Sequence, residues 1–180
     1  MSAVARNRLP TLAMFAILCL LPAAGCGREG ADGGAEQAAV APDTYFPVDL
    51  GGHTLRLQLA LTDGESARGL MFRDPLPEDH GMVFVFAEAK ERAFWMKNTR
   101  IPLDLGYFDA SGRLLALHKL FPRDTTRVRS ASDKVALAVE TNRGWFREHG
   151  VSPGARLDLG ALARAVRARG FDPAAFAPDF

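Results

Sequence analysis

Short apolar runs separated by turn residues fill the sequence from residue 44 to residue 159. Residues 53–61 place leucine at every second position, which is the period of a strand with one buried face. Residues 44–50 precede them, and Gly51-Gly52 supplies the positive φ angles that a two-residue hairpin turn requires. Many short strands of this kind favour an antiparallel sandwich or barrel. We therefore expect a compact, mainly β domain.

Five later segments have the composition of strands. They are residues 81–86, 103–108, 113–121, 135–139 and 155–159. Residues 93–96 are expected to pair with the first of them. The turn Asp109-Ala110-Ser111-Gly112 has the residues of a hairpin and joins the second to the third. The apolar run 135–139 ends at Glu140, which places that carboxylate at a strand end.

One or two short helices are expected between the strands. Thr62 and Glu65 have the spacing of a capping box, and Gly69 stands where a helix C-terminus favours glycine. A second helix would carry Trp145 and Phe146, with Thr141 or Asn142 as its cap.

Residues 1–25 have the pattern of a secretory signal. A short basic region precedes the apolar run 12–21, which is too short to span a bilayer, and small residues follow. The ending Ala23-Ala24-Gly25-Cys26 resembles a bacterial lipobox, although Ala23 stands where leucine is preferred. That resemblance implies acylation of Cys26 and a lipid tether to the periplasmic side of the envelope. Gly27 at the next position implies the outer membrane in a Gram-negative cell.

The mature chain then divides into three parts. Residues 26–43 have the composition of a flexible linker, residues 44–160 form a single domain, and residues 161–180 form a basic helical tail. The composition favours a solvated tail, with contact to anionic lipid as the alternative. The net charge of +1, together with export, argues against a nucleic-acid partner. Cys19 leaves with the signal, so the mature chain has no intramolecular disulfide and no thiol nucleophile.

The hexapeptide Phe94-Trp95-Met96-Lys97-Asn98-Thr99 mixes polar groups with bulky apolar side chains, and Pro102-Leu103-Asp104 follows closely. Polar groups buried without partners cost roughly 1–3 kcal/mol each. Such a segment is therefore either a polar network inside a core or one wall of a binding site.

Several motifs in this order resemble the bacterial and archaeal family known as domain of unknown function 192. They are Gly69-Leu70-Met71-Phe72-Arg73, Gly81-Met82-Val83-Phe84-Val85-Phe86, the hexapeptide, Pro102-Leu103-Asp104 and the strand that ends in Glu140. The resemblance implies a β-sandwich, jelly-roll-like fold in a family that is often exported and has no established activity. Gly106 departs from the pattern, which prefers a bulkier residue there.

The polar cluster favours a binding or accessory module at the envelope, with an unknown small molecule or envelope component as its partner. Lys97 would bind an anion or a carbonyl group, or it would instead pair with Asp104 or Glu140. The residues predicted to bind the ligand are Lys97, Asn98, Thr99, Asp104, Glu140, Trp95 and Arg68.

Three alternatives stay open. Asp104 and Glu140 could serve as acid and base in a hydrolase acting on envelope polysaccharide. A Cu(I) site would use methionine and histidine ligands, namely Met71, Met82, Met96 and His118. The motifs could also serve only to specify the fold. No cofactor motif occurs in the sequence and no metal site is assigned. The sequence does not decide whether the chain is an enzyme, and it favours binding.

Overall fold

The computed structural model describes residues 39–180, which fold as a mainly β domain with a few short helices. The predicted signal peptide, Cys26 and most of the predicted linker lie outside the described residues. The strands are β1 (Phe46–Leu50), β2 (His53–Ala60), β3 (His80–Val85), β4 (Ala93–Phe94), β5 (Leu103–Phe108), β6 (Leu114–Leu120), β7 (Val128–Arg129) and β8 (Leu137–Asn142). The helices are α1 (Asp63–Arg68), α2 (Trp145–Glu148), α3 (Leu159–Ala168) and a 3-10 turn, η1 (Pro173–Ala175).

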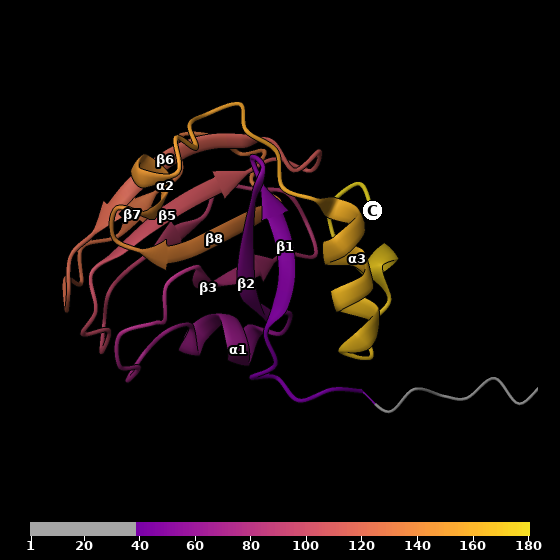
Figure 1. Cartoon of the computed structure of the whole chain (residues 1–180), viewed down its shortest axis with the longest axis horizontal. Coiled ribbons are helices and arrows are strands. Elements are labelled where there is room, and N and C mark those ends of the chain that lie inside the picture. The colour runs from indigo at the N-terminus through magenta and orange to yellow at the C-terminus, as the bar shows by residue number, and fades with distance from the viewer. Residues whose placement is uncertain (1–38) are drawn as a thin grey trace, which may run out of the picture. The chain divides into compact units, whose positions relative to one another are not determined.

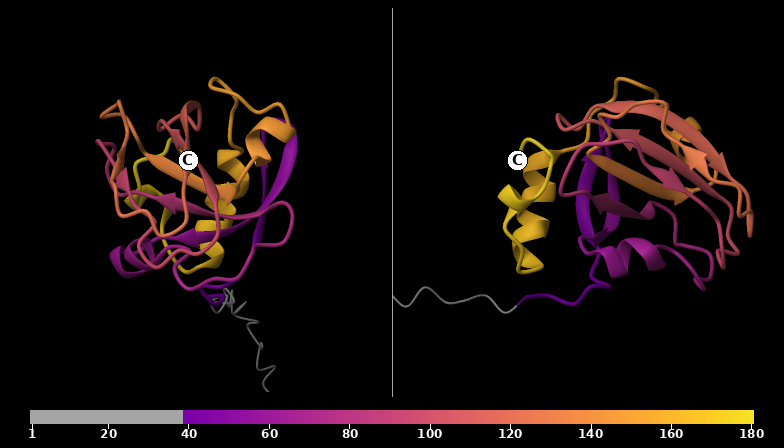
Figure 2. Two further views of the ribbon diagram at one scale, coloured as in Figure 1. Left: turned by 90° about the vertical axis from the view of Figure 1, so that its left-hand side faces the viewer. Right: turned by 180° about the vertical axis from the view of Figure 1, so that it is seen from behind.

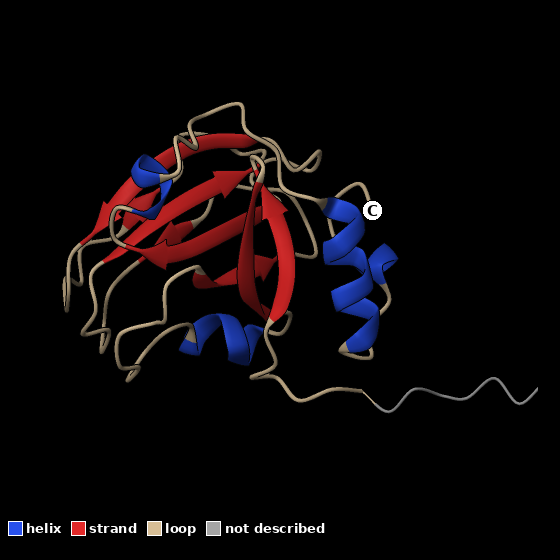
Figure 3. Cartoon of the chain, viewed as in Figure 1, coloured by secondary structure: helices blue, strands red, loops and turns tan. Residues whose placement is uncertain are grey.

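Six strands form one sheet in the order β1-β2-β3-β8-β5-β6, and β4 pairs with β7 in a small second sheet (Figure 1). The helices lie around the margins of the strands (Figure 3). Both predicted hairpins are present. The first turns at Gly51 and Gly52, which have φ angles of 63° and 88°, and it pairs Leu50 with His53. The second joins β5 to β6.

The expected pairing of residues 93–96 with β3 is wrong. Strand β3 pairs in parallel with β2 and antiparallel with β8, while β4 pairs with β7. A parallel pair needs a long crossover connection, and residues 61–79, which include α1, provide it. The Tyr107 hydroxyl of β5 donates to the Val128 carbonyl oxygen of β7 (2.9 Å), which ties the small sheet to the large one.

Helix α1 begins at the predicted capping box. The Glu65 amide donates to Thr62 Oγ1 (3.2 Å), and the Thr62 amide donates to Glu65 Oε2 (3.1 Å). The Gly69 amide donates to the Glu65 carbonyl oxygen at the C-terminal end (2.8 Å). Because every one of these contacts is local, the sequence spacing alone predicts the helix.

Strand β8 continues past Glu140 to Asn142, so Glu140 lies inside the strand rather than at its end. The continuation pairs with β5, where Leu103 lies opposite Asn142. Helix α2 therefore starts later than expected, with Gly144 as its N-cap at a φ of 95°. Residues 155–159 do not form the predicted strand, and only isolated bridges at Arg156 and Leu157 connect them to the sheets.

The large sheet separates two apolar clusters because successive side chains of a strand point to opposite faces. The helix-side core packs α2 and α3 against one face, and it includes Leu57, Val83, Val139, Phe146 and Leu162. The pocket-side core covers the other face, and it includes Met82, Phe84, Leu105, Tyr107 and Ala138. Gly106 faces the helix-side core, where an added Cβ would lie 3.0 Å from Phe146. The ring of Phe146, which belongs to α2, thus occupies the space that a larger side chain at residue 106 would fill.

The C-terminal segment belongs to the folded core rather than forming a solvated tail. Helix α3 lies beside β1 (Figures 1 and 2), and it buries Leu162, Ala165 and Val166 in the helix-side core. Beyond η1, the Ala177 amide donates to the carbonyl oxygen of Phe86 (2.8 Å). No helix in residues 39–180 is long and apolar enough to cross a membrane.

The three arginines of this segment have different surroundings. Arg164 and Arg167 are exposed on α3. Arg169 is buried, and it donates to the Leu59 carbonyl oxygen (3.0 Å) and to Glu65 Oε1 (2.5 Å). The basic pattern of the segment is therefore only partly a solvent-facing feature, because Arg169 joins α3 to β2 and α1.

Candidate functional site

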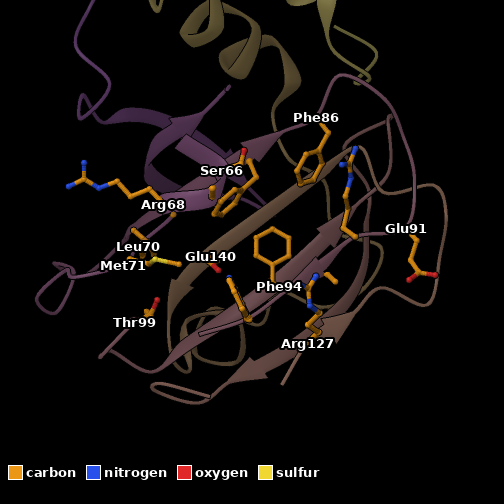
Figure 4. A pocket seen from close by; sticks show the side chains of 16 residues that line it. Ser66, Arg68, Leu70, Met71, Phe86, Glu91, Phe94, Thr99, Arg127 and Glu140 are labelled. Atoms are coloured by element: carbon orange, nitrogen blue, oxygen red, sulfur yellow. The ribbon is translucent and has the colours of Figure 1, made fainter. Parts of the chain in front are cut away.

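A cavity of about 440 Å³ opens on the pocket-side face of the large sheet. We call it the pocket. Its lining comes from α1 and the turn after it, the end of β3, β4, and the hexapeptide at residues 94–99. In Figure 4, Phe94 and Glu140 lie between Arg68 at one edge and Arg127 and Glu91 at the other.

Glu140 reaches the pocket from the middle of β8, with Met82 of β3 and Leu105 of β5 directly beside it. Its exposed fraction is only 4%. Burial raises the pKa of Glu140 to about 8, because a charged carboxylate loses its hydration there. Burial alone accounts for the shift, and the side chain makes no hydrogen bond or ion pair with any of residues 39–180. At neutral pH it is therefore a carboxylic acid with a proton to donate.

Aromatic side chains form much of the wall around Glu140. The rings of Phe84 and Phe94 meet edge to face with their centroids 4.8 Å apart. Trp95 also lines the pocket and is 39% exposed. Such rings offer a large apolar contact area to a bound molecule.

The rim carries more positive than negative charge. Arg68, Arg92 and Arg127 line the pocket, and the guanidinium of Arg92 lies 3.8 Å from the ring centroid of Phe86. Glu91, the acidic side chain at the rim, pairs with Arg129 (2.7 Å). Since Glu140 is protonated at neutral pH, the pocket favours a ligand that bears negative charge or hydrogen-bond acceptors.

The structure brings together four of the seven predicted binding residues. Trp95, Thr99, Glu140 and Arg68 all line the pocket. Lys97 and Asn98 instead line a second hollow, which shares no lining residue with the pocket. The hexapeptide therefore contributes different residues to two hollows.

Asp104 lies away from both sites. It accepts a hydrogen bond from the Gly144 amide (2.8 Å) and lies 3.3 Å from the Arg143 guanidinium. In the register of β5 and β8, Asp104 is opposite Thr141 while Glu140 is opposite Leu105. The two carboxyl groups consequently point to opposite faces of the sheet. The acid–base pair proposed for polysaccharide hydrolysis is not assembled.

The proposed copper ligands do not converge either. Met82, Glu140, Leu105 and His118 occupy one row across β3, β8, β5 and β6. Since neighbouring strands lie about 4.8 Å apart, Met82 and His118 are separated by roughly 14 Å. Within residues 39–180 no group of three or more His, Cys, Asp or Glu side chains is placed to hold a metal ion.

Two arginines of the pocket were missed by sequence reasoning. Arg92 ends the charged stretch Glu88-Ala89-Lys90-Glu91-Arg92, which has the composition of a solvated loop. Arg127 lies in another polar loop, and its guanidinium lies 5.4 Å from the Trp95 ring centroid. Neither stretch carries a signal that distinguishes a pocket residue from an ordinary surface arginine.

Comparison with known proteins agrees with this fold. A solved structure from Novosphingobium aromaticivorans DSM 12444, a protein of unknown function, is 32% identical and has a TM-score of 0.62. It matches 69% of this chain and 96% of its own length. A protein from Sinorhizobium meliloti 1021, described as a candidate transcription regulator, is 33% identical with the same TM-score. That match covers 67% of this chain and 97% of the other.

A comparison with curated proteins finds no match. The family described as DUF192, uncharacterized ACR, matches residues 46–159, which include every strand of the domain and Glu140. The chain belongs to this domain of unknown function 192 family.

Proposed function

We propose that this chain is an exported, lipid-anchored envelope protein whose domain binds a small amphipathic molecule in the pocket. The observation that carries the proposal is Glu140, a buried and protonated acid that faces a cavity without a polar partner among the described residues. An unsatisfied polar group in a cavity is a common mark of a binding site.

The lining defines the chemistry of the ligand. An apolar or aromatic body would pack against Phe84, Phe94 and Trp95. A carbonyl or carboxylate oxygen would accept the proton of Glu140, and negative charge would lie near the arginines of the rim. The cavity of about 440 Å³ suits a small organic molecule, since such sites measure about 300–1,000 Å³.

The lining favours recognition over catalysis. It offers the hydroxyls of Ser66 and Thr99, and no histidine or cysteine is among the described residues that line it. A nucleophile with an adjacent base, as covalent catalysis requires, is therefore not formed by these side chains.

A ligand screen tests the proposal. The full chain is screened by thermal shift against small aromatic and aliphatic acids and carbonyl compounds at neutral pH. We expect hits to bind Glu140→Gln with similar affinity, since the amide still donates. Glu140→Leu should weaken binding by about tenfold or more, because leucine offers no hydrogen-bond donor to the acceptor oxygen of the ligand.

The pH dependence supplies an independent readout. Affinity of the wild type for an acceptor ligand should fall above pH 8, where Glu140 loses its proton. The affinity of Glu140→Gln should not change across that range. Equal affinity of the hits for wild type and Glu140→Leu would refute the proposed role of the pocket.

Lipid anchoring is tested separately in a bacterial host. Supporting this part of the proposal is the sequence Ala23-Ala24-Gly25-Cys26 after an apolar run. The wild type should incorporate labelled palmitate and sediment with membranes, whereas Cys26→Ser should do neither. An unlabelled, soluble wild type would contradict the anchor while leaving the pocket proposal intact.

A further inference from the structure

The second hollow takes Lys97 and Asn98 from the hexapeptide and shares no lining residue with the pocket. It has a volume of about 360 Å³ and is lined by Phe72, Lys97, Asn98, Arg100, Arg123 and Thr125. We call it the basic hollow. Three of its six lining residues are cationic and none is acidic. Lys97, Arg100 and Arg123 form no ion pair with any residue in the range 39–180. Three like charges around one depression repel one another.

The backbone of the basic hollow adopts unusual conformations. Within residues 39–180, four non-glycine residues have positive φ, and three of them line this hollow. They are Phe72 (62°), Asn98 (57°) and Arg123 (62°). For a bulky residue such as Phe72 this region is a true outlier, and such strain persists only where the surrounding structure enforces it.

Backbone hydrogen bonds between loops enforce these conformations. The Phe72 amide donates to the Asn98 carbonyl oxygen (3.0 Å), and the Arg123 amide donates to the Thr99 carbonyl oxygen (2.8 Å). The Met96 amide also donates to the Asp124 carbonyl oxygen (2.7 Å). These hydrogen bonds fix three separate loops against one another, and they thereby hold the backbone that carries the three cationic residues in place.

We propose that Lys97, Arg100 and Arg123 form a binding site for a phosphate-type oxyanion, separate from the pocket. Arginine can bind two oxygens of a phosphate at once, and lysine adds a compact point charge. The Asn98 amide and the Thr125 hydroxyl line the same hollow and can donate to further oxygens. This site does not depend on the function proposed for the pocket.

The surroundings of the hollow suggest two sources for such a group. Phe72 at its edge is 61% exposed, and Phe121, two residues from Arg123, is 58% exposed. Exposed rings beside cations suit the phosphate of a lipid headgroup, whose acyl chains they would contact. A free phosphate ion would use the cationic residues alone.

Isothermal titration calorimetry of the full chain at neutral pH and low ionic strength tests the site. The probes are inorganic phosphate and dihexanoylphosphatidylglycerol below its micelle concentration. We expect Lys97→Gln and Arg100→Gln each to raise the dissociation constant by about tenfold, because each removes a charge-assisted hydrogen bond. Arg123→Asn should do the same, since asparagine tolerates positive φ. The matched control is Arg164→Gln on the exposed face of α3, which should bind as the wild type does.

Each outcome decides the question. Binding of phosphate that the three variants lose supports a site for the free ion. Binding of the lipid alone, lost in the same variants and weakened in Phe72→Ser, supports a headgroup site. The proposal is overturned if neither probe binds, or if the hollow variants bind as Arg164→Gln does. Should Arg123→Asn fail to fold, Lys97→Gln and Arg100→Gln still provide the test, because both residues are exposed and neither has a positive φ.

Discussion

Glu140 lies in the middle of the large sheet, where its side chain has no charged or hydrogen-bonding partner within residues 39–180. In the unfolded chain the same carboxylate is fully hydrated. Burial raises the pKa of the folded-state carboxyl from 4.5 to about 8, so the folded domain holds this proton at neutral pH and the unfolded chain does not. Folding near neutrality is therefore coupled to the uptake of a proton.

This coupling predicts how stability depends on pH. The free energy of unfolding of the wild type should fall as the pH rises from 4.5 to about 8, because only the unfolded chain has lost the proton. Glu140→Gln cannot ionise and should lack this decline. At pH 7 we expect the variant to be more stable than the wild type by up to about 3 kcal/mol, since one pKa unit is about 1.4 kcal/mol. Urea unfolding at a series of pH values measures the difference.

Glu78→Gln is the matched control, because Glu78 is exposed. Its unfolding free energy should follow the wild-type curve at every pH. If the curve for Glu140→Gln also followed the wild type from pH 5 to pH 9, the carboxyl would have to be ionised in the folded protein.

The sequence identified Glu140, Trp95, Thr99 and Arg68 because each belongs to a motif or stands beside one. The sequence could not show which face of the sheet each side chain points to. Asp104 and Glu140 differ in role only because the register of β5 against β8 turns them to opposite faces. That register is set by strands far apart in the chain, which a pattern of local spacing does not encode.

Local elements were predictable and long-range pairings were not. The two hairpins and the capping box of α1 depend on residues within a few positions of one another. Strand β3 instead pairs with β2, which precedes it across a helical crossover, and with β8, which follows it by more than fifty residues. All six strands of the large sheet could be expected from their composition, whereas the short strand β7 and the order of the sheet could not.

Gly81 shows how closely β3 and β8 approach. A Cβ added at this residue would collide with the backbone carbonyl oxygen of Glu140 and lie 3.1 Å from Leu57. We therefore expect Gly81→Ala to lower the free energy of unfolding by more than about 2 kcal/mol, because a backbone must move. Chemical denaturation measures this loss. A ligand of the pocket should also bind more weakly, since the displaced atoms belong to Glu140.

Gly64→Ala in α1 is the corresponding control. An added Cβ there meets nothing within 4 Å, and the backbone is helical. Alanine is the better helix former, so this variant should be unchanged or more stable by up to about 1 kcal/mol. If Gly81→Ala left the free energy of unfolding unchanged, β3 and β8 would be able to move apart at no cost in stability.

The domain as a whole depends on its C-terminal segment. Leu162 of α3 is fully buried among side chains of the helix-side core. Leu162→Ala should cost about 2–5 kcal/mol, as other buried leucines do when truncated. Arg167 lies on the same helix but is exposed, so Arg167→Gln should change the free energy of unfolding by less than about 0.5 kcal/mol. Thermal unfolding of both variants compares them, and equal melting temperatures would mean that α3 is not packed on the core.

Strand β8 has a consequence for how the chain is completed. It lies between β3 and β5 in the sheet, although both of those strands precede it in the sequence. During synthesis, residues 80–85 and 103–108 are therefore available before the strand that joins them. Until residues 137–142 emerge, two strand edges have unpaired amides and carbonyls, and such edges invite pairing with other chains. The strands β1-β2-β3 and β5-β6 can therefore join into one sheet only after β8, in the last third of the chain, has been synthesised.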